Sequence, residues 1–593
     1  MSLTAGASLL PAPPPPPPGT LAVTPRKGRT FLRGVRIMWV AARFGYYWWL
    51  DQKDWSYAPG ESRTEREIKR AHWLREQLVS LGPTFIKIGQ TLSTRVDLLP
   101  RTYVDEMAEL QDRIPPFSTA LARKFIEEEL GKPVEAVYRD FPDAPIAAAS
   151  LGQVYRTWLH DGTEVAVKVQ RPELLEIFAE DLTVLRRMAV WAENRVDWLK
   201  SVELLDILDE FGRKLHEEID YVREADNADR FRANFADYPG IAVPVMYRAY
   251  SSHRVLTMEF MHGTKVSNEN ILKEYGIAIP EMVRHLSQIN LKQLLEDGYF
   301  HADLHPGNIL IDRDGRVIFV DFGLMGEITR SMRAQMVEAF FHIVDRDINA
   351  LMTDLVLLDF IRPGQDPAPL KPTIAWVIDQ SLQPMDKRPT FKEMTLPLSK
   401  IFYDYHIRVP VNFSWIIRTV IALEGLAMML DPTFHPFDVA IPFAAKMLLS
   451  ESGQDIRDRF VDEIFTPEGL DWDRLFELIA LARRDPGFKM GEVADLGMAW
   501  IVSKEGRVVR GKALDEILGD KPIPWDKIEA LIDMIQQDPT FDLMAMARPM
   551  INFMLSPEGR PFQQRLAWKV GKDLITGRLG EWTGLYKVIR AIL

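Results

Sequence analysis

The sequence predicts an α+β protein with two lobes, preceded by a helical N-terminal extension and followed by a helical C-terminal tail. Alternating residues at 149–156 and 164–170 are typical of strands, and the turn His-Asp-Gly-Thr at 160–163 is typical of a hairpin. Helical periodicity dominates between about residues 65 and 130 and again after residue 330. The polar motifs gather between the strand-rich and the helical part, so we expect a functional site where the two lobes meet.

Composition divides the chain into six segments. From the N-terminus we expect a disordered Pro-rich tail (1–25), a basic aromatic amphipathic segment (26–60), a helical extension (61–140), a small lobe with inserted helices (141–260), a larger lobe (261–450) and a helical C-terminal region (451–593). Shorter elements are also predicted: helices at 202–235 and 279–297, and strands at 243–247, 254–258, 309–312 and 316–321. The run from Pro14 to Pro18 cannot propagate a helix, which argues against a signal peptide in the first 25 residues.

The bulk composition excludes several classes of function. The 593 residues carry a formal net charge of -12, and this disfavours nucleic acid as the main partner. The chain has no cysteine, which excludes disulfides, thiolate metal sites and a cysteine nucleophile, and fits a reducing cytoplasm. Beyond the Pro-rich tail no uncharged apolar run is long enough to span a membrane, so we do not expect a transmembrane helix.

The segment from residue 26 to residue 50 predicts a basic helix rich in aromatic residues. Arg29, Arg33, Arg36 and Arg43 fall on one stripe at helical spacing, among many Trp, Tyr and Phe residues. Such a helix suits the interface of an anionic membrane, because arginines meet headgroups and aromatic rings lie at the boundary. The alternative is a helix that docks on the protein's own surface with its arginines in solvent. We favour peripheral membrane association.

The strongest chemical signal is a pair of motifs, His-Ala-Asp-Leu-His-Pro-Gly-Asn at 301–308 and Asp-Phe-Gly at 321–323. Asn308 follows Asp303 by five residues, and a short hairpin then leads to Asp321. This is the spacing of a kinase catalytic loop followed by its metal-binding triplet. Asn308 and Asp321 would hold Mg²⁺ through oxygen atoms, and Asp303 would accept a proton from an attacking hydroxyl or orient a water.

Residues upstream complete the outline of a protein-kinase-like fold with an ATP site. Lys168 ends the pattern Val-Ala-Val-Lys, whose lysine grips the α- and β-phosphates, and carboxylates that could fix it follow on one helical stretch. In place of a glycine-rich phosphate loop the sequence has alanines, so the phosphates would be held differently. The residues expected to contact the nucleotide, besides Lys168 and Asn308, are Ala147, Ala148, Ala149 and Ser150 in this loop and Met258, Glu259 and Met261 at the hinge to adenine.

The alanine-rich loop, together with Lys-Ile-Gly-Gln at 87–90 and Glu-Ile-Asp at 218–220, resembles the UbiB/ADCK family of atypical kinases over about residues 65–450. The resemblance implies that Lys87 and Gln90 belong to an extension that folds over the cleft. It also implies that Glu218 and Asp220 engage this extension and that Glu224 is the ion-pair partner of Lys168. Read alone, Lys87 would be a solvated residue opposite an apolar helical stripe. The family is associated with isoprenoid quinone (ubiquinone-type) biosynthesis and lipid homeostasis at membranes.

Two functions are consistent with these residues. The first is a Mg²⁺-dependent ATPase or kinase in which Asp303, Lys168 and Glu224 carry the chemistry, with a lipid or quinone precursor as client. Phosphorylation of large protein substrates is doubtful, because no Ala-Pro-Glu follows Asp321 and the cleft resembles a blocked one. The second is a nucleotide-gated scaffold for membrane enzymes. A small-molecule phosphotransferase of the aminoglycoside or choline type explains neither Lys87 to Gln90 nor the alanines.

Overall fold

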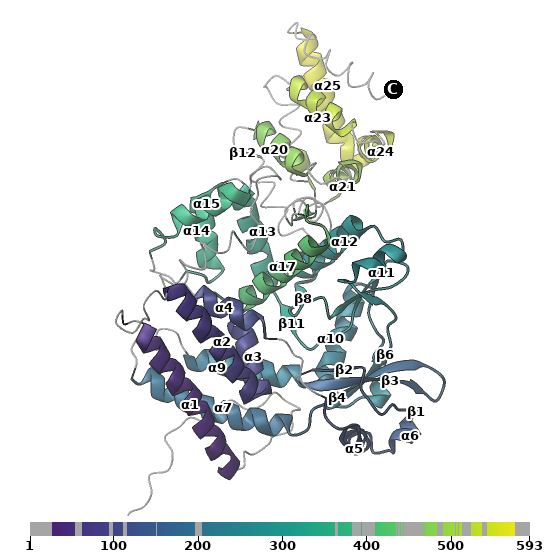
Figure 1. Cartoon of the computed structure of the whole chain (residues 1–593). Coiled ribbons are helices and arrows are strands. Elements are labelled where there is room, and N and C mark those ends of the chain that lie inside the picture. Colours follow the sequence, from purple (N-terminus) through teal and green to yellow (C-terminus); the bar gives the residue numbers. More distant parts are fainter. Residues whose placement is uncertain are drawn as a thin grey trace, which may run out of the picture. The chain divides into compact units, whose positions relative to one another are not determined.

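The computed structural model describes most of the chain (Figure 1). The described residues are 27–51, 53, 62–93, 99–110, 116–149, 151–195, 204–344, 346–361, 366–381, 393, 409–434, 436, 439–440, 443, 465–466, 469–482, 490–504, 506–507, 509–512, 524–536 and 543–575. The predicted Pro-rich tail lies outside them. The chain forms two compact units, and the first comprises Met1–Met282, Tyr299–Ile328 and Leu355–Pro432. Every residue of the predicted site belongs to this first unit.

The smaller lobe is built on an antiparallel sheet. Its strands are β1 (Tyr138–Arg139), β2 (Ala147–Ala148), β3 (Gly152–Leu159), β4 (Glu164–Gln170) and β6 (Val255–Glu259), in the order β1-β3-β4-β6 with β2 paired to β3. Alternate residues of β3 and β4, such as Tyr155 and Val167, are fully buried in one core. Helix α5 (Thr119–Leu130) contributes Ile126 to that core, and α6 (Val134–Val137) leads into β1. The sheet pairs Lys168 of β4 with Leu256 of β6, two residues before the hinge at Met258.

The N-terminal extension is a separate layer of helices beside the inserted helix α7 (Leu174–Glu193). It comprises α1 (Lys27–Asp51), α2 (Arg63–Leu81), α3 (Pro83–Leu92) and α4 (Arg101–Ala108). A second core joins them, with Leu78 of α2, Phe85 of α3 and Met107 of α4 all buried. Ser62 and Glu65 form a capping box at the start of α2, and Gly82 takes a φ of +95° at the tight turn into α3.

Helix α1 confirms the predicted helix but orients its arginines differently from both interpretations above. Arg33 forms a bidentate ion pair with the fully buried Asp181 of α7, at 2.7 and 2.9 Å. Arg36 donates to the carbonyl of Ser80, 3.0 Å away, and Arg43 lies on the ring of Trp73. The described arginines therefore serve docking on the protein itself. Arg36 and Arg43 stay exposed. The large hydrophobic side chains that α1 also exposes form an apolar, aromatic face: Phe31, Leu32, Val35, Met38, Trp39, Tyr46 and Trp49.

The catalytic segment of the first unit folds around two small sheets. The strands are β5 (Ile241–Ala242), β10 (Val317–Phe319), β9 (Ile309–Ile311) and β7 (Thr264–Lys265) in one, and β8 (Tyr299–His301) with β11 (Met325–Glu327) in the other. Helices α9 (Leu204–Glu218), α10 (Tyr221–Asn234), η2 (Arg248–Tyr250), α11 (Glu269–Glu274), α15 (Lys371–Ser381) and α17 (Val411–Leu430) complete this unit. The strands β8 and β9 flank the loop that carries Asp303 and Asn308.

Among the described residues, α17 is long and apolar enough to cross a membrane at Phe413–Leu430, judged by length and composition. More than half of that stretch, 56%, is buried within the protein. It also contains Arg418 and the buried Glu424. These features are typical of a core helix of the fold.

The second unit is mainly helical in the residues described and comprises Val283–Gly298, Thr329–Asp354 and Thr433–Leu593. Its elements are most of α12 (Ile279–Leu291), the π-helix η3 (Lys292–Asp297), α13 (Arg330–Val344), α14 (Ile348–Leu357), α20 (Trp472–Ala482), α21 (Met490–Val502), α23 (Trp525–Gln536), α24 (Leu543–Leu555), η6 (Pro557–Gly559) and α25 (Arg560–Ile575), with the strand pair β12 (Phe465–Thr466) and β13 (Gly469–Leu470).

Several sequence-based boundaries need correction. The strand expected at 149–156 begins at Gly152 and runs to Leu159, whereas the strand at 164–170 is confirmed. The helix expected at 202–235 is two helices, because Asp220 leaves the helical conformation and caps α10. The strand expected at 243–247 is reduced to a single bridge between Met246 and Met258.

Candidate active site

Lys168 lies at the centre of a charge cluster between the smaller lobe and the Asp-Phe-Gly segment. Its Nζ is 2.9 Å from both carboxylate oxygens of Glu224 and 3.2 Å from Oδ2 of Asp321. Burial disfavours the charged lysine, but Asp321 and Glu224 outweigh it and raise the pKa of Lys168 well above its usual value. The lysine is therefore a fixed cation, held between a nearly inaccessible glutamate of α10 and the more open Asp321.

Asp321 is held in its charged form. Its partial desolvation would raise its pKa, but Lys168 and the backbone N–H of Gly323, which donates to Oδ1 over 3.0 Å, lower it. The lowered pKa leaves a carboxylate at neutral pH, 40% exposed along its side chain and open to a cation. Asp321 can thus form an ion pair with Lys168 and bind a metal ion as well.

The catalytic loop is ordered by hydrogen bonds that start at His301. The ring Nε2 lies 2.5 Å from the carbonyl of Asp321, and the backbone N–H of Asp303 donates to Nδ1 over 3.2 Å. Because a carbonyl only accepts and an N–H only donates, these partners assign a neutral ring with its proton on Nε2. Burial lowers the pKa of His301, which agrees with that neutral form. One buried ring therefore ties the strand before Asp303 to the metal-binding triplet.

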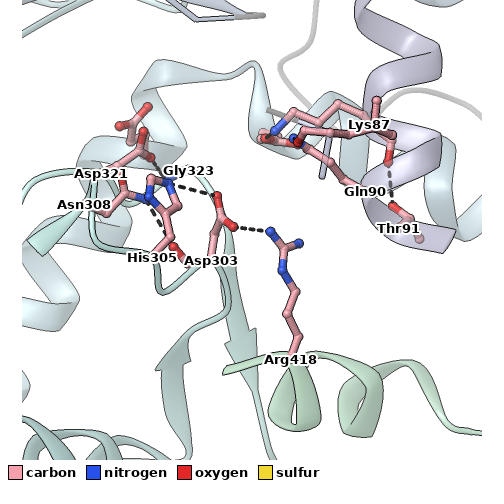
Figure 2. A network of polar contacts seen from close by, with 12 residues as sticks. Lys87, Gln90, Thr91, Asp303, His305, Asn308, Asp321, Gly323 and Arg418 are labelled. Carbon is pink, nitrogen blue, oxygen red and sulfur yellow. Dashed lines mark hydrogen bonds and ion pairs between the residues drawn. The ribbon is translucent and has the colours of Figure 1, made fainter. Parts of the chain in front are cut away.

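Asp303 and Asn308 lie on opposite ends of the loop and are joined by it. The amide nitrogen of Asn308 donates to the carbonyl of Asp303 over 3.1 Å, which leaves the Asn308 amide oxygen as an acceptor. Burial opposes ionisation of Asp303, but Arg418 and Lys87 outweigh it and lower the pKa of the carboxyl group. Figure 2 shows Asp303, Asn308 and Asp321 together. The set combines a carboxylate suited to proton transfer with two oxygen donors suited to a hard cation.

The predicted hinge is the end of β6 and the residues after it. Met258 is buried, and its neighbour across the sheet is Ala166 of β4. The N–H of Glu259 donates to the carbonyl of Val245 over 2.8 Å and its carboxylate accepts from the N–H of the same residue. Among the described residues the N–H of Met261 has no hydrogen-bond acceptor. The hinge therefore presents one buried side chain and one available backbone donor.

The alanine-rich segment forms the short strand β2 and the turn that leads into β3. Ala147 and Ala148 pair with β3, and the N–H of Ala149 donates to the carbonyl of Gly152 over 2.8 Å. A Cβ atom at Gly152 would lie 2.4 Å from the hydroxyl of Tyr221 and 2.7 Å from the carbonyl of Val169, so this position requires glycine. Ser150 lies outside the described residues.

Each residue of the Lys-Ile-Gly-Gln motif on α3 has a structural partner. Lys87, 9% exposed, forms an ion pair with Glu218 at the end of α9. A Cβ at Gly89 would lie 2.1 Å from Cδ1 of Leu110, so glycine lets the helix pack closely there. The side chain of Gln90 donates to the carbonyl of Leu110 over 3.3 Å. The motif therefore fixes α3 against α4 and presents its lysine to α9.

Comparison with known proteins places this fold in a family. A family model for the ABC1 atypical kinase-like domain matches residues 109–355. The protein slr1919 of Synechocystis sp., which is uncharacterised, is 36% identical over 86% of this chain and 90% of its own length. The chloroplastic protein Activity of bc1 complex kinase 3 of Arabidopsis thaliana is 32% identical over 91% of this chain and 81% of its own. The chain belongs to the ABC1 atypical kinase family, also called ABC1/UbiB.

A solved structure also resembles this ABC1 family member. The complex of Rv3197 with erythromycin from Mycobacterium tuberculosis matches with a TM-score of 0.43 and 22% sequence identity, over 61% of this chain and 92% of that chain.

One expectation drawn from the family resemblance needs correction in this ABC1 protein. Asp220 does not engage the extension together with Glu218. Its Oδ1 accepts from the N–H of Val222 over 3.0 Å, as the cap of α10, and pairs with Nδ1 of His253 at 2.8 Å. An aspartate directly before a helix satisfies the free N–H groups of its first turn, and this local bond determines where the Asp220 side chain lies. Glu218 alone of the two contacts Lys87.

Arg418 is a site residue of this ABC1 protein that the motifs did not reveal. It reaches from α17 to Oδ1 of Asp303, as Figure 2 shows. A charged residue inside an otherwise apolar helical stretch was the available signal, since such a residue usually has a dedicated partner. Its partner lies 115 residues earlier in the chain, and no local pattern predicts that pairing.

Proposed function

We propose that this ABC1 family member binds ATP with Mg²⁺ and transfers or hydrolyses its γ-phosphate. The arrangement of Lys168, held by Glu224 beside Asp321, carries the proposal. It aligns a permanent cation with an ionised carboxylate, as a site for a magnesium-bound triphosphate requires. Family membership supports an atypical kinase-like activity, and the reaction and its cofactors are our inference from the residues.

The donor chemistry of the site fits magnesium. Asp321 offers a carboxylate and Asn308 an amide oxygen, and Mg²⁺ prefers such hard oxygen ligands completed by phosphate and water. Bound magnesium would neutralise charge on the phosphates. Lys168 would hold the α- and β-phosphates, and the N–H of Met261 with the buried Met258 would orient the adenine. Asp303 would then take the proton of the attacking hydroxyl or water.

We further propose that the enzyme works at a membrane surface, on a lipid or quinone precursor. The apolar, aromatic face of α1 supports contact with lipid, because rings and aliphatic side chains at a membrane interface leave water. Arg33 and Arg36 bind groups of the protein itself, so we expect the exposed apolar side chains of α1 to contribute more to membrane contact than attraction to anionic headgroups does. The relative named above is chloroplastic, which fits a membrane-rich compartment. The link to isoprenoid quinones is drawn from the family alone.

A nucleotide-gated scaffold is the alternative, and the ion pair between Arg418 and Asp303 favours it. A base occupied by an arginine is not free to take a proton. In this alternative the nucleotide changes the shape of the site while turnover stays low.

Phosphate release from ATP by the full-length protein separates the two functions. We expect Mg²⁺-dependent release that rises with liposomes, neutral or anionic. In the Asp303→Asn variant, the rate of phosphate release should fall by about a hundredfold or more, since a positioned base contributes 10²–10⁴-fold. Nucleotide binding should persist. The Asp321→Asn variant should lose both phosphate release and nucleotide affinity. Tight binding with equal, negligible release in the wild type and Asp303→Asn would reject hydrolysis and favour the scaffold.

A further inference from the structure

A pocket opens beside Asp303, away from the residues assigned to ATP. Its enclosed volume is about 70 Å³, and the empty space counted out to its open mouth is about 780 Å³. Helices α3, α9 and α17 provide its walls, and Lys168, Glu224 and Asp321 are not among the lining residues. Because Asp303 lines it, an acceptor hydroxyl bound here would lie within reach of the proposed base.

Most of the wall surface of the pocket is apolar, although polar and charged residues also line it. Phe211 and Leu215 of α9, Trp415 of α17 and Leu324 after the Asp-Phe-Gly triplet all line it. The ion pair of Lys87 with Glu218 joins α3 to α9 at the wall of the pocket. The pocket therefore suits a small molecule with an apolar body.

Three cations line the same space, and one of them, Lys87, is paired with Glu218. Lys214 lies 4.7 Å from the ring centre of Trp415, with Glu217 at 3.2 Å as its ion-pair partner. Arg418 uses one guanidinium nitrogen for Asp303, and among the described residues its other nitrogens donate to no acceptor. A guanidinium carries five N–H donors in a fork that fits a carboxylate or a phosphate. The pocket thus combines apolar walls with donors for an acid.

We propose that this pocket binds the phosphoryl acceptor, and that the acceptor is a small amphiphile with a carboxylate or phosphate group near its hydroxyl. The proposal rests on the function proposed above. The acid group would take Arg418 from Asp303, and the freed carboxylate would receive the hydroxyl proton. The hydroxyl oxygen bonds to the γ-phosphorus, the bond to the bridging oxygen breaks with its electron pair going to ADP, and Asp303 passes the proton to water. Arg418 therefore competes with the acceptor hydroxyl for Asp303, and an acidic acceptor raises the fraction of the base that is free.

Calorimetric titration tests the assignment without turnover. Decanoate, decyl phosphate and 1-decanol share one apolar body and differ in the head group. We expect the two acids to bind the full-length protein at least about tenfold more tightly than the alcohol, since a charge-assisted hydrogen bond is worth that much. Arg418→Gln should abolish this preference and leave the affinity for 1-decanol near the wild-type value. Phe211→Ala should weaken all three.

The matched control is Arg186→Gln, which removes the same charge from an ion pair with Asp209 of α9 outside the pocket. It should keep the preference for the acids. Equal affinity of the three amphiphiles for the wild type, or an undiminished preference in Arg418→Gln, would overturn the proposal. So would binding of inorganic phosphate as tight as that of decyl phosphate, because the apolar walls would then contribute nothing.

Asp321→Asn separates this proposal from the function on which it rests. If that variant loses nucleotide binding but keeps the preference for acidic amphiphiles, the pocket stands independently of the ATP site. If wild-type protein turns over ATP but shows no such preference, the function stands and the acceptor assignment fails.

Discussion

At the scale of the single residue, His301 links the two aspartates of the site through one neutral ring. Its pKa is lowered from about 6.5, chiefly by burial. As the pH falls, the histidine of the unfolded chain therefore binds a proton at a higher pH than that of the folded chain. The stability that this residue contributes is complete above pH 6.5 and is lost as the pH falls below it. We expect wild-type protein to lose up to about 1.4 kcal/mol of unfolding free energy per pH unit in that range, relative to His301→Gln.

Urea denaturation at pH 8 and at pH 5.5 measures this difference. The glutamine keeps a donor for the carbonyl of Asp321 and an acceptor for the N–H of Asp303, and it does not titrate in this range. Parallel pH dependence in both proteins would show that His301 is not held neutral.

Local sequence determined most of the site at this scale. Asp303, Asn308 and Asp321 were predicted from their spacing, because one loop and one hairpin bring them together. Arg418 was not, because it meets Asp303 through the packing of a distant helix. The family resemblance assigned Glu218 and Asp220 together, as one Glu-Ile-Asp motif. The two side chains nevertheless bind different partners.

At the scale of the element, α1, α3 and α7 meet at one buried carboxylate. Asp181 of α7 is fully buried, and it accepts from Arg33 of α1 and from the hydroxyl of Thr84 of α3 at 2.5 Å. Thr84 lies one helical turn before Lys87 on α3. The same carboxylate therefore fixes both the exposed helix and the helix that lines the pocket.

Removing one member of the ion pair between Arg33 and Asp181 should lower the free energy of unfolding strongly. Arg33→Gln leaves the Asp181 charge buried without its cation, at a cost of about 3–5 kcal/mol. The double variant Arg33→Met with Asp181→Leu removes both charges and should recover most of that loss. Arg63→Gln, which breaks the exposed pair with Glu67 on α2, should cost less than about 1 kcal/mol.

Urea denaturation of the four proteins provides the comparison. A loss in Arg33→Gln no larger than that in Arg63→Gln would mean that Asp181 does not hold α1. The amphipathic pattern predicted α1 as a helix, but not this pairing. Arginine spacing defines a stripe, and the position of a buried carboxylate 148 residues later decides where that stripe points.

At the scale of the whole molecule, net charge and the exposed face of α1 act in opposite directions at a membrane. The formal charge of -12 repels an anionic surface, while Phe31 and Leu32, at 71% and 72% exposure, can enter the interface of any bilayer. Apolar burial should therefore dominate. We expect the protein to cosediment with neutral phosphatidylcholine vesicles and to stay bound as salt is raised, since apolar contact is not screened.

The variant Phe31→Asp with Leu32→Asp should abolish this binding, because each buried apolar side chain contributes about 1.5–3 kcal/mol and a charge in its place opposes insertion. Val79→Asp, at an exposed apolar position of α2 outside this face, is the matched control and should bind as the wild type does. The opposite result is binding to anionic vesicles alone that salt releases and that the Phe31 and Leu32 changes do not alter. That result would mean that the arginines make the membrane contact. In that case Arg33 and Arg36 would have to leave Asp181 and Ser80 for the lipid, and α1 would detach from α7 when the protein binds.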